Sequence, residues 1–104
     1  MASVEFVVEG NDQKLTVKVI GEIAADTCNE LRETVIELSG RKPAQIVLDF
    51  AQLSFIDTSG LGVLVGLRTH LKARGVVISL VNLQPRVKHV FQLTQISKLF
   101  GIES

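Results

Sequence analysis

The chain lacks the residues that would indicate disulfide or membrane chemistry. Cys28 is the only cysteine among 104 residues, so no internal disulfide can form. There is no tryptophan or tyrosine, and five phenylalanines are the only aromatic side chains. No apolar run approaches the roughly 20 residues that a membrane-spanning helix needs. Residues 1–3 also lack the pattern that starts a signal peptide. We therefore expect a cytoplasmic protein without membrane insertion.

An excess of charge of one sign is also missing. Eleven basic and eleven acidic residues give a formal net charge of zero. Nucleic-acid binding would require lysines and arginines clustered with stacking aromatics, so we expect no nucleic-acid partner. No set of histidines and cysteines has the spacing of metal ligands, and the sequence predicts neither a metal nor a cofactor. The length suits one hydrophobic core, and we predict a single domain over residues 1–104.

The apolar pattern predicts an α/β fold. Residues 3–9 and 14–20 alternate apolar and polar side chains on either side of a turn, as an antiparallel hairpin does. Continuous apolar runs are typical of buried strands, and they occur at residues 45–50 and 76–81. Helical spacing predicts helices over residues 26–39, 59–73 and 84–93, with a short strand at Ile102. This order favours a mixed sheet layered by helices.

The first predicted helix has a clear apolar stripe and a candidate N-cap. Its inward positions are spaced by three and four residues: Cys28, Leu31, Val35 and Leu38. Asp26 precedes them and is the candidate cap, because a carboxylate can accept hydrogen bonds from the free N–H groups of a first turn. This pattern makes Cys28 a core residue rather than a reactive thiol.

The unusual stretch is FIDTSGLGVLVG, residues 55–66, where Asp57-Thr58-Ser59 lies between apolar segments. The simplest interpretation is a helix cap followed by glycines that allow close packing. A modified hydroxyl is an alternative, because the N-terminus of a helix favours an anion. A phosphate there would change the surface charge without melting the helix.

Catalysis and nucleotide binding fit this stretch poorly. The G-x-S-x-G pattern of a nucleophile elbow is absent, and His70 lies roughly 16 Å along the helix from Ser59. The glycines match neither phosphate-binding motif, since Val65 stands where the third glycine of G-x-G-x-x-G belongs. Gly62 and Gly66 share a helix face and allow close approach by the sheet or by another protein. We expect a binding protein, not an enzyme.

Residues 46–102 resemble STAS domains, the anti-sigma factor antagonist family of bacterial partner-switching proteins, and the likeness runs over nearly the whole chain. The resemblance is carried by D-[ST]-[ST]-G-[LIV]-G, which residues 57–62 match in full. Asp49 after a buried strand, Glu22 after the second strand and the segment NLQPRVKHVFQLT also match. The resemblance implies a single STAS domain with a central mixed β-sheet and helices packed on one side.

The resemblance also implies a function in signal transduction and transcription regulation. A stand-alone member binds an anti-sigma factor serine/threonine kinase and so frees a sigma factor. The kinase phosphorylates a hydroxyl of the motif, which ends binding, and a phosphatase removes the phosphate. The register of the motif favours Thr58 as the phosphate acceptor, whereas the side-chain type favours Ser59. Both residues remain candidates, and Thr58 is preferred.

The family pattern suggests which residues contact the partner. They lie in the motif and in the loop after the second strand: Asp57, Gly60, Leu61, Gly62, Glu22, Ala24 and Asp26. Many members carry aspartate where this chain has Ala24, and Asp26 can substitute for it. The alternative function is a STAS interaction module of a signalling or transporter complex in which the hydroxyls are structural and phosphorylation plays no part.

Overall fold

The computed structural model describes residues 1–102, in which a five-stranded sheet is joined to four helices. The strands are β1 (Val4–Gly10), β2 (Lys14–Ile23), β3 (Gln45–Asp49), β4 (Leu53–Ile56) and β5 (Val77–Val81). The helices are α1 (Cys28–Ser39), α2 (Thr58–Ala73), α3 (Pro85–Gln92) and α4 (Ile96–Leu99).

The long strand β2 organises the sheet. It pairs antiparallel with β1 along its length, as the predicted hairpin requires. Its first half pairs parallel with β3, which in turn pairs parallel with β5. Its last residues pair parallel with β4, so β3 and β4 lie one after the other along the same side of β2. The sheet order is therefore β1-β2-β3-β5, with β4 added at the end of β2.

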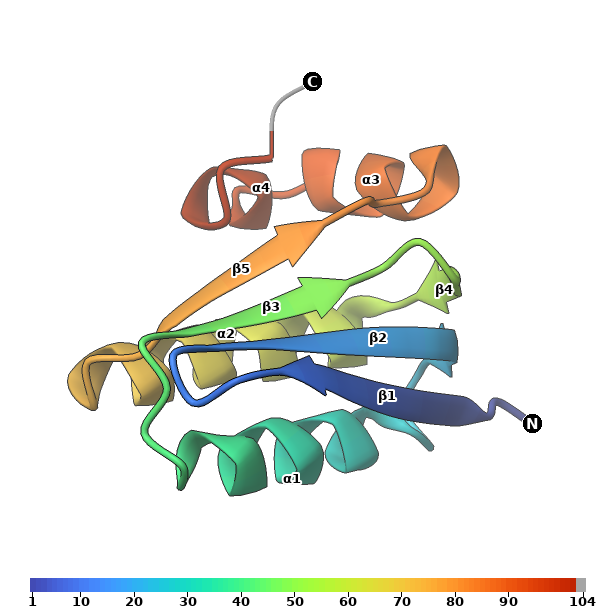
Figure 1. Cartoon of the computed structure of the whole chain (residues 1–104). Coiled ribbons are helices and arrows are strands. Elements are labelled where there is room, and N and C mark those ends of the chain that lie inside the picture. Colours follow the sequence, from blue (N-terminus) through green and yellow to red (C-terminus); the bar gives the residue numbers. More distant parts are fainter. Residues whose placement is uncertain (103–104) are drawn as a thin grey trace.

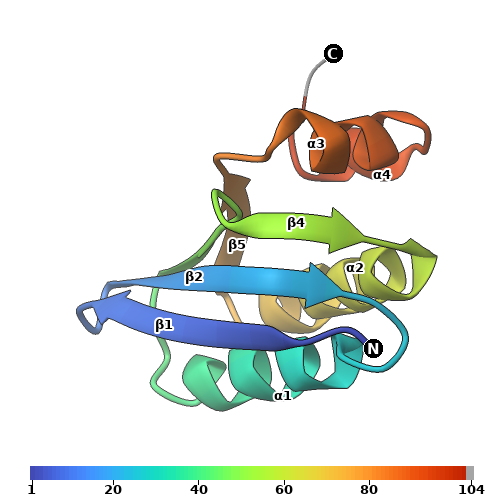
Figure 2. The same ribbon diagram turned by 90° about the vertical axis from the view of Figure 1, so that its right-hand side faces the viewer.

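One face of the sheet is covered by α1 and α2, which lie side by side (Figures 1 and 2). The predicted apolar stripe of α1 is confirmed, since all four of its inward residues are buried. From β2 and β3, Leu15, Val17, Ile46 and Leu48 join the same core. In Figure 1, α3 and α4 lie beyond β5, and α3 also packs against β4.

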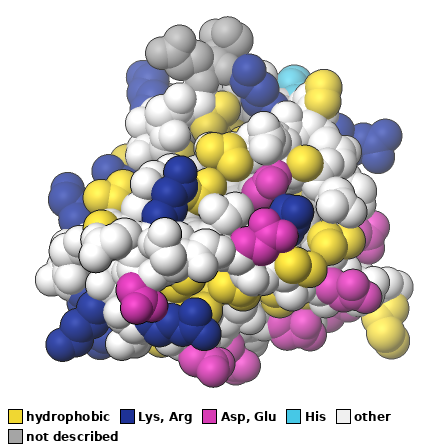
Figure 3. Space-filling model, in the orientation of Figure 1, with side chains coloured by type: hydrophobic (Ala, Val, Ile, Leu, Met, Phe, Trp, Pro, Cys, Tyr) yellow, Lys and Arg dark blue, Asp and Glu magenta, His cyan; other side chains and the backbone are white. Residues whose placement is uncertain are grey.

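On the opposite face of the sheet, no helix of residues 1–102 covers β1 and β2, and the side chains there are mixed. Figure 3 shows hydrophobic patches there interspersed with side chains of both charges. Lys18 of β2 forms an ion pair with Glu9 of β1 at 3.3 Å. Val7, opposite Lys18 in the register, is exposed.

The predicted fold class, an α/β domain with a mixed sheet, is confirmed, and three details of the prediction are wrong. The strand β4 was missed, because its four residues are too few to show a period. The run at residues 76–81 is not buried on both faces: β5 is an edge strand, and Val77 is 60% exposed. Ile102 is not in a strand and packs against the core after α4.

No helix within residues 1–102 has the length and apolar character needed to cross a membrane.

The core predicts a contrast between two leucines. Leu48 of β3 is 0% exposed, whereas Leu93 after α3 is 71% exposed. Leu48→Ala should lower the free energy of unfolding by about 2–5 kcal/mol, through lost burial and the cavity left behind. Leu93→Ala should change it by less than about 0.5 kcal/mol. Urea unfolding followed by circular dichroism measures both, and equal effects would contradict this assignment of the core.

Candidate functional site

The start of α2 is held by one carboxylate. Oδ1 of Asp57 accepts hydrogen bonds from the backbone N–H of Ser59 at 2.9 Å and of Gly60 at 3.2 Å. The N–H of Asp57 itself donates to the carbonyl of Ile23 at the end of β2, at 3.2 Å. A helix leaves its first four N–H groups without intrahelical partners, and this cap satisfies two of them. A helix cap was predicted within Asp57-Thr58-Ser59, and the structure shows that Asp57 is the residue that provides it.

Both candidate hydroxyls lie in the first turn of α2. Thr58 is the first residue of the helix and is exposed, whereas Ser59 is half-buried. Within residues 1–102, neither hydroxyl makes a hydrogen bond. The partial positive charge of the helix N-terminus favours an anion at this place. The Thr58 hydroxyl therefore lies on an exposed residue at this helix end and makes no hydrogen bond to residues 1–102.

The loop after β2 flanks the same helix start. Because β2 and β4 are parallel neighbours, Ile23 lies opposite Ile56 and both strands end at one edge of the sheet. The chain then turns from β2 into α1 and from β4 into α2, as Figure 2 shows. Glu22 and Ala24 are half-buried at this edge, and Asp26 is exposed. The structure thus brings the predicted loop residues and the motif to one end of the molecule.

Asp26 is not the N-cap of α1, contrary to the prediction. Its Oδ2 accepts a hydrogen bond from the N–H of Ala2 at 3.1 Å and so ties the N-terminal segment to the loop. The N-cap position belongs to Thr27, whose side chain makes no capping bond to α1. The Thr27 hydroxyl instead accepts from the N–H of Ala24 and donates to the carbonyl of Glu22, each at 2.9 Å.

Thr27 is therefore a site residue that the sequence did not reveal. It is buried, and its two hydrogen bonds close the loop beside the start of α2. The available signal was a hydroxyl residue directly before a helix. That signal is typical of an ordinary N-cap, so it could not show that the side chain points back into the loop.

Two of the predicted contact residues lie in the core. Leu61 is 2% exposed and Gly60 is buried, so neither lies on the surface of this structure. A Cβ atom on Gly60 would lie 2.6 Å from Cγ2 of Ile23 and 2.7 Å from Cγ1 of Ile56. Gly60 is therefore needed for packing of α2 against the sheet. Gly62 is exposed, and nothing lies within 4 Å of the position its Cβ would take.

Asp49 is the last residue of β3 and has a structural role. Its Oδ1 accepts hydrogen bonds from the N–H of Ala51 at 2.9 Å and from Nδ2 of Asn82 at 3.3 Å. These bonds join the turns that follow β3 and β5. Over residues 1–102, no three histidine, cysteine, aspartate or glutamate side chains gather as metal ligands would.

The two glycines at the start of α2 predict opposite effects of one added methyl group. Gly60→Ala should lower the free energy of unfolding by about 1–3 kcal/mol, because the methyl group collides with two core isoleucines. Gly62→Ala is the matched control, and it should raise stability by up to about 1 kcal/mol because alanine is the better helix former. Thermal unfolding measures both, and a harmless Gly60→Ala would contradict the close packing.

The cap predicts a difference between two substitutions of Asp57. Asp57→Ala should lower the free energy of unfolding by about 0.5–2 kcal/mol, because two N–H groups lose their acceptor. Asp57→Asn keeps an oxygen acceptor and removes the charge, so its stability should stay within a few tenths of a kcal/mol of the original. Urea unfolding compares the variants. Equal losses would show that the charge, and not the hydrogen bonds, stabilises the helix start.

Comparison with known proteins identifies relatives of this chain in sequence and in fold. The sequence pattern of the STAS domain family matches residues 5–104. The anti-sigma-B factor antagonist of Bacillus subtilis (strain 168) is 29% identical over 97 residues, which cover 93% of this chain and 88% of that protein. Twenty curated proteins match significantly.

Solved structures agree with the sequence comparison. An anti-sigma factor antagonist from Mycobacterium paratuberculosis matches with a TM-score of 0.79 and 26% identity, over 94% of this chain and 83% of that one. The unphosphorylated form of the anti-sigma factor antagonist SpoIIAA has a TM-score of 0.74 and 24% identity, over 96% of this chain and 100% of that one. SpoIIAA has also been solved in its phosphorylated form, with a TM-score of 0.68 and 24% identity over 90% and 86% of the two chains. Because the family pattern matches residues 5–104, nearly the whole chain, this chain belongs to the STAS domain family.

Proposed function

We propose that this chain is an anti-sigma factor antagonist that binds a kinase-type anti-sigma factor and is released when a hydroxyl at the start of α2 is phosphorylated. The observation that carries the proposal is the exposed Thr58 hydroxyl, which has no hydrogen bond within residues 1–102 and lies directly after the Asp57 cap. The names of the relatives support the antagonist role. The family and these relatives fit a binding protein that performs no catalysis itself.

The binding surface of the proposal surrounds this hydroxyl. It comprises the exposed start of α2 and the neighbouring loop: Asp57, Thr58, Gly62, Glu22, Ala24 and Asp26. Gly62 has no side chain, so a partner can approach the helix backbone closely. Gly60 and Leu61 support this surface from beneath, since both are buried. Thr27 fixes the loop through its two hydrogen bonds.

Thr58 is the preferred acceptor on accessibility. Thr58 is exposed and Ser59 is half-buried, so a kinase reaches Thr58 with less displacement of the helix start. In the proposed step, the γ-phosphoryl group passes from ATP, bound to the partner kinase, to the hydroxyl oxygen, and the hydroxyl proton is released. ADP is the leaving product. A phosphatase reverses the step by hydrolysing the phosphate ester with water.

The phosphate ends binding by adding charge rather than by unfolding the helix. It carries about −1.5 to −2 charges at neutral pH, and the helix N-terminus favours an anion. The carboxylate of Asp57 already occupies the N–H groups of Ser59 and Gly60. The phosphate therefore stays at the surface beside a second negative charge. Burying that charge pair in an interface is unfavourable without a matching cation.

Phosphorylation by the cognate anti-sigma factor kinase tests the proposal. With kinase, ATP and Mg²⁺, peptide mass spectrometry should detect one phosphate on α2, and Thr58→Ala should remove it. Ser59→Ala should retain it. Thr69→Ala is the matched control, because Thr69 is an exposed threonine of the same helix whose hydroxyl already bonds to the carbonyl of Val65.

The outcomes separate the two candidate functions. Phosphate that remains in Thr58→Ala and disappears in Ser59→Ala would keep the switch and move the acceptor to Ser59. No phosphate on either residue, together with tight kinase binding, would overturn the switch. It would leave a STAS interaction module of a signalling or transporter complex whose hydroxyls are structural.

A further inference from the structure

A concave site lies at the end of α2 that is opposite to the hydroxyl motif. It is a pocket of about 570 Å³ between the loops that join α1 to β3 and α2 to β5. Arg74, which lines it, caps the C-terminal end of α2, whereas Thr58 begins that helix. The 16 residues of α2 separate the two ends by roughly 22–24 Å at 1.5 Å per residue. The pocket volume lies in the range typical of small-molecule sites.

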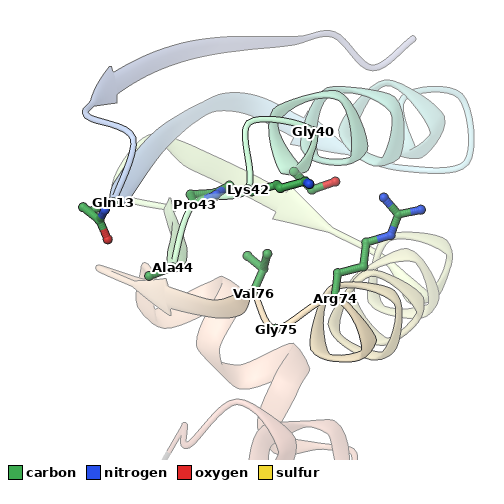
Figure 4. A pocket seen from close by; sticks show the side chains of 9 residues that line it. Gln13, Gly40, Lys42, Pro43, Ala44, Arg74, Gly75 and Val76 are labelled. Carbon is green, nitrogen blue, oxygen red and sulfur yellow. The ribbon is translucent and has the colours of Figure 1, made fainter.

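Two cationic side chains and no acidic side chain line the pocket. Lys42 and Arg74 extend from different loops toward the same end of the pocket in Figure 4. None of its lining residues is an aspartate or glutamate. Within residues 1–102 the one ion pair joins Lys18 to Glu9, so neither cation of the pocket is neutralised by a carboxylate. Both cations belong to exposed residues, so their side chains are available to an anion in the pocket.

Lys42 also has an unfavourable backbone conformation. Its φ is +54°, in the left-handed region that glycine and asparagine adopt most readily. Only one other non-glycine residue within 1–102 has a positive φ, and it is an asparagine, Asn82. The turn is held by the N–H of Lys42, which donates to the carbonyl of Ser39 at 3.0 Å. Backbone strain of this kind concentrates at functional sites.

The remaining walls of the pocket are apolar or amide-bearing. Pro43, Ala44 and Val76 supply an apolar surface, and Gln13 supplies an amide. In Figure 4, Gln13 lies on the far side of Pro43 from the two cations. A ligand that fits this arrangement has an anionic group at one end and an apolar body at the other.

We propose that this pocket binds a small organic phosphate monoester, with the phosphate between Lys42 and Arg74 and the apolar body against Pro43 and Val76. Two convergent cations match the charge of a phosphate monoester at neutral pH. Arginine binds phosphate oxygens bidentately, and lysine binds them as a point charge. The competing explanation is structural: cations near helix C-termini also offset the partial negative charge of those ends.

Titration with phenyl phosphate, followed by amide chemical shifts, tests the proposal. Saturable shifts should appear at the amides of Gly40, Lys42, Gly75 and Val76. Inorganic phosphate should bind at least about threefold more weakly, because it lacks the apolar body, and neutral benzyl alcohol should cause no saturable shift at these amides. Equal affinity for the two phosphates would overturn the role of the apolar wall. Absence of saturable shifts with phenyl phosphate at millimolar concentrations would overturn the site.

Charge-removing variants separate binding from a structural role. Lys42→Gly removes the charge and suits the positive φ, so it should remain folded by circular dichroism and bind phenyl phosphate at least tenfold more weakly. Arg74→Gln should weaken binding similarly. Arg86→Gln is the matched control, because Arg86 is exposed on α3 and does not line the pocket. Unchanged affinity in Lys42→Gly and Arg74→Gln, or an equal loss in Arg86→Gln, would contradict the proposal.

Discussion

The packing of α2 against the ends of β2 and β4 determines the geometry of the site. Gly60 allows this approach, since a Cβ atom there would lie within 2.7 Å of carbon atoms of both Ile23 and Ile56. Asp57 then fixes the helix start by bonding to Ser59 and Gly60, and its own N–H bonds to Ile23. These hydrogen bonds and contacts fix the position of the first turn of α2 and therefore place the Thr58 hydroxyl at the surface.

A switch at this position can act without refolding the domain. The proposed phosphate is attached where the helix N-terminus tolerates an anion, and the core residues beneath it, such as Leu61, are not disturbed. In the proposed switch the change is confined to surface charge beside Asp57, and that charge would oppose burial of this surface against a partner. The pocket near Arg74 lies at the other end of α2, so a ligand bound there would leave the hydroxyl and its loop free for a partner.

Much of the fold could be predicted because its apolar patterns are long enough to show a period. The hairpin of β1 and β2 and the inward stripe of α1 were clear on this ground. The strand β4 was not, because four residues contain too little pattern to separate a strand from a loop. The exposure of Val77 depends on β5 being at the edge of the sheet. Strand order decides this, and local sequence does not.

In the site, the motif predicted a helix cap, and Asp57 provides it. The hydrogen-bond partners of Asp26 and Thr27 depend on how the loop after β2 folds back on itself, and no local sequence pattern encodes this loop conformation.

The most direct test of the central claim is a calorimetric titration of the cognate anti-sigma factor kinase with this chain in two forms, unphosphorylated and stoichiometrically phosphorylated on α2. The account predicts saturable binding of the unphosphorylated form and an affinity at least about a hundredfold lower for the phosphorylated form, with unchanged circular dichroism spectra. A hundredfold loss corresponds to about 2.7 kcal/mol, which is within the range for a charge left unpaired in an interface. Equal affinities of the two forms would contradict the account, because the start of α2 would then not be the switch.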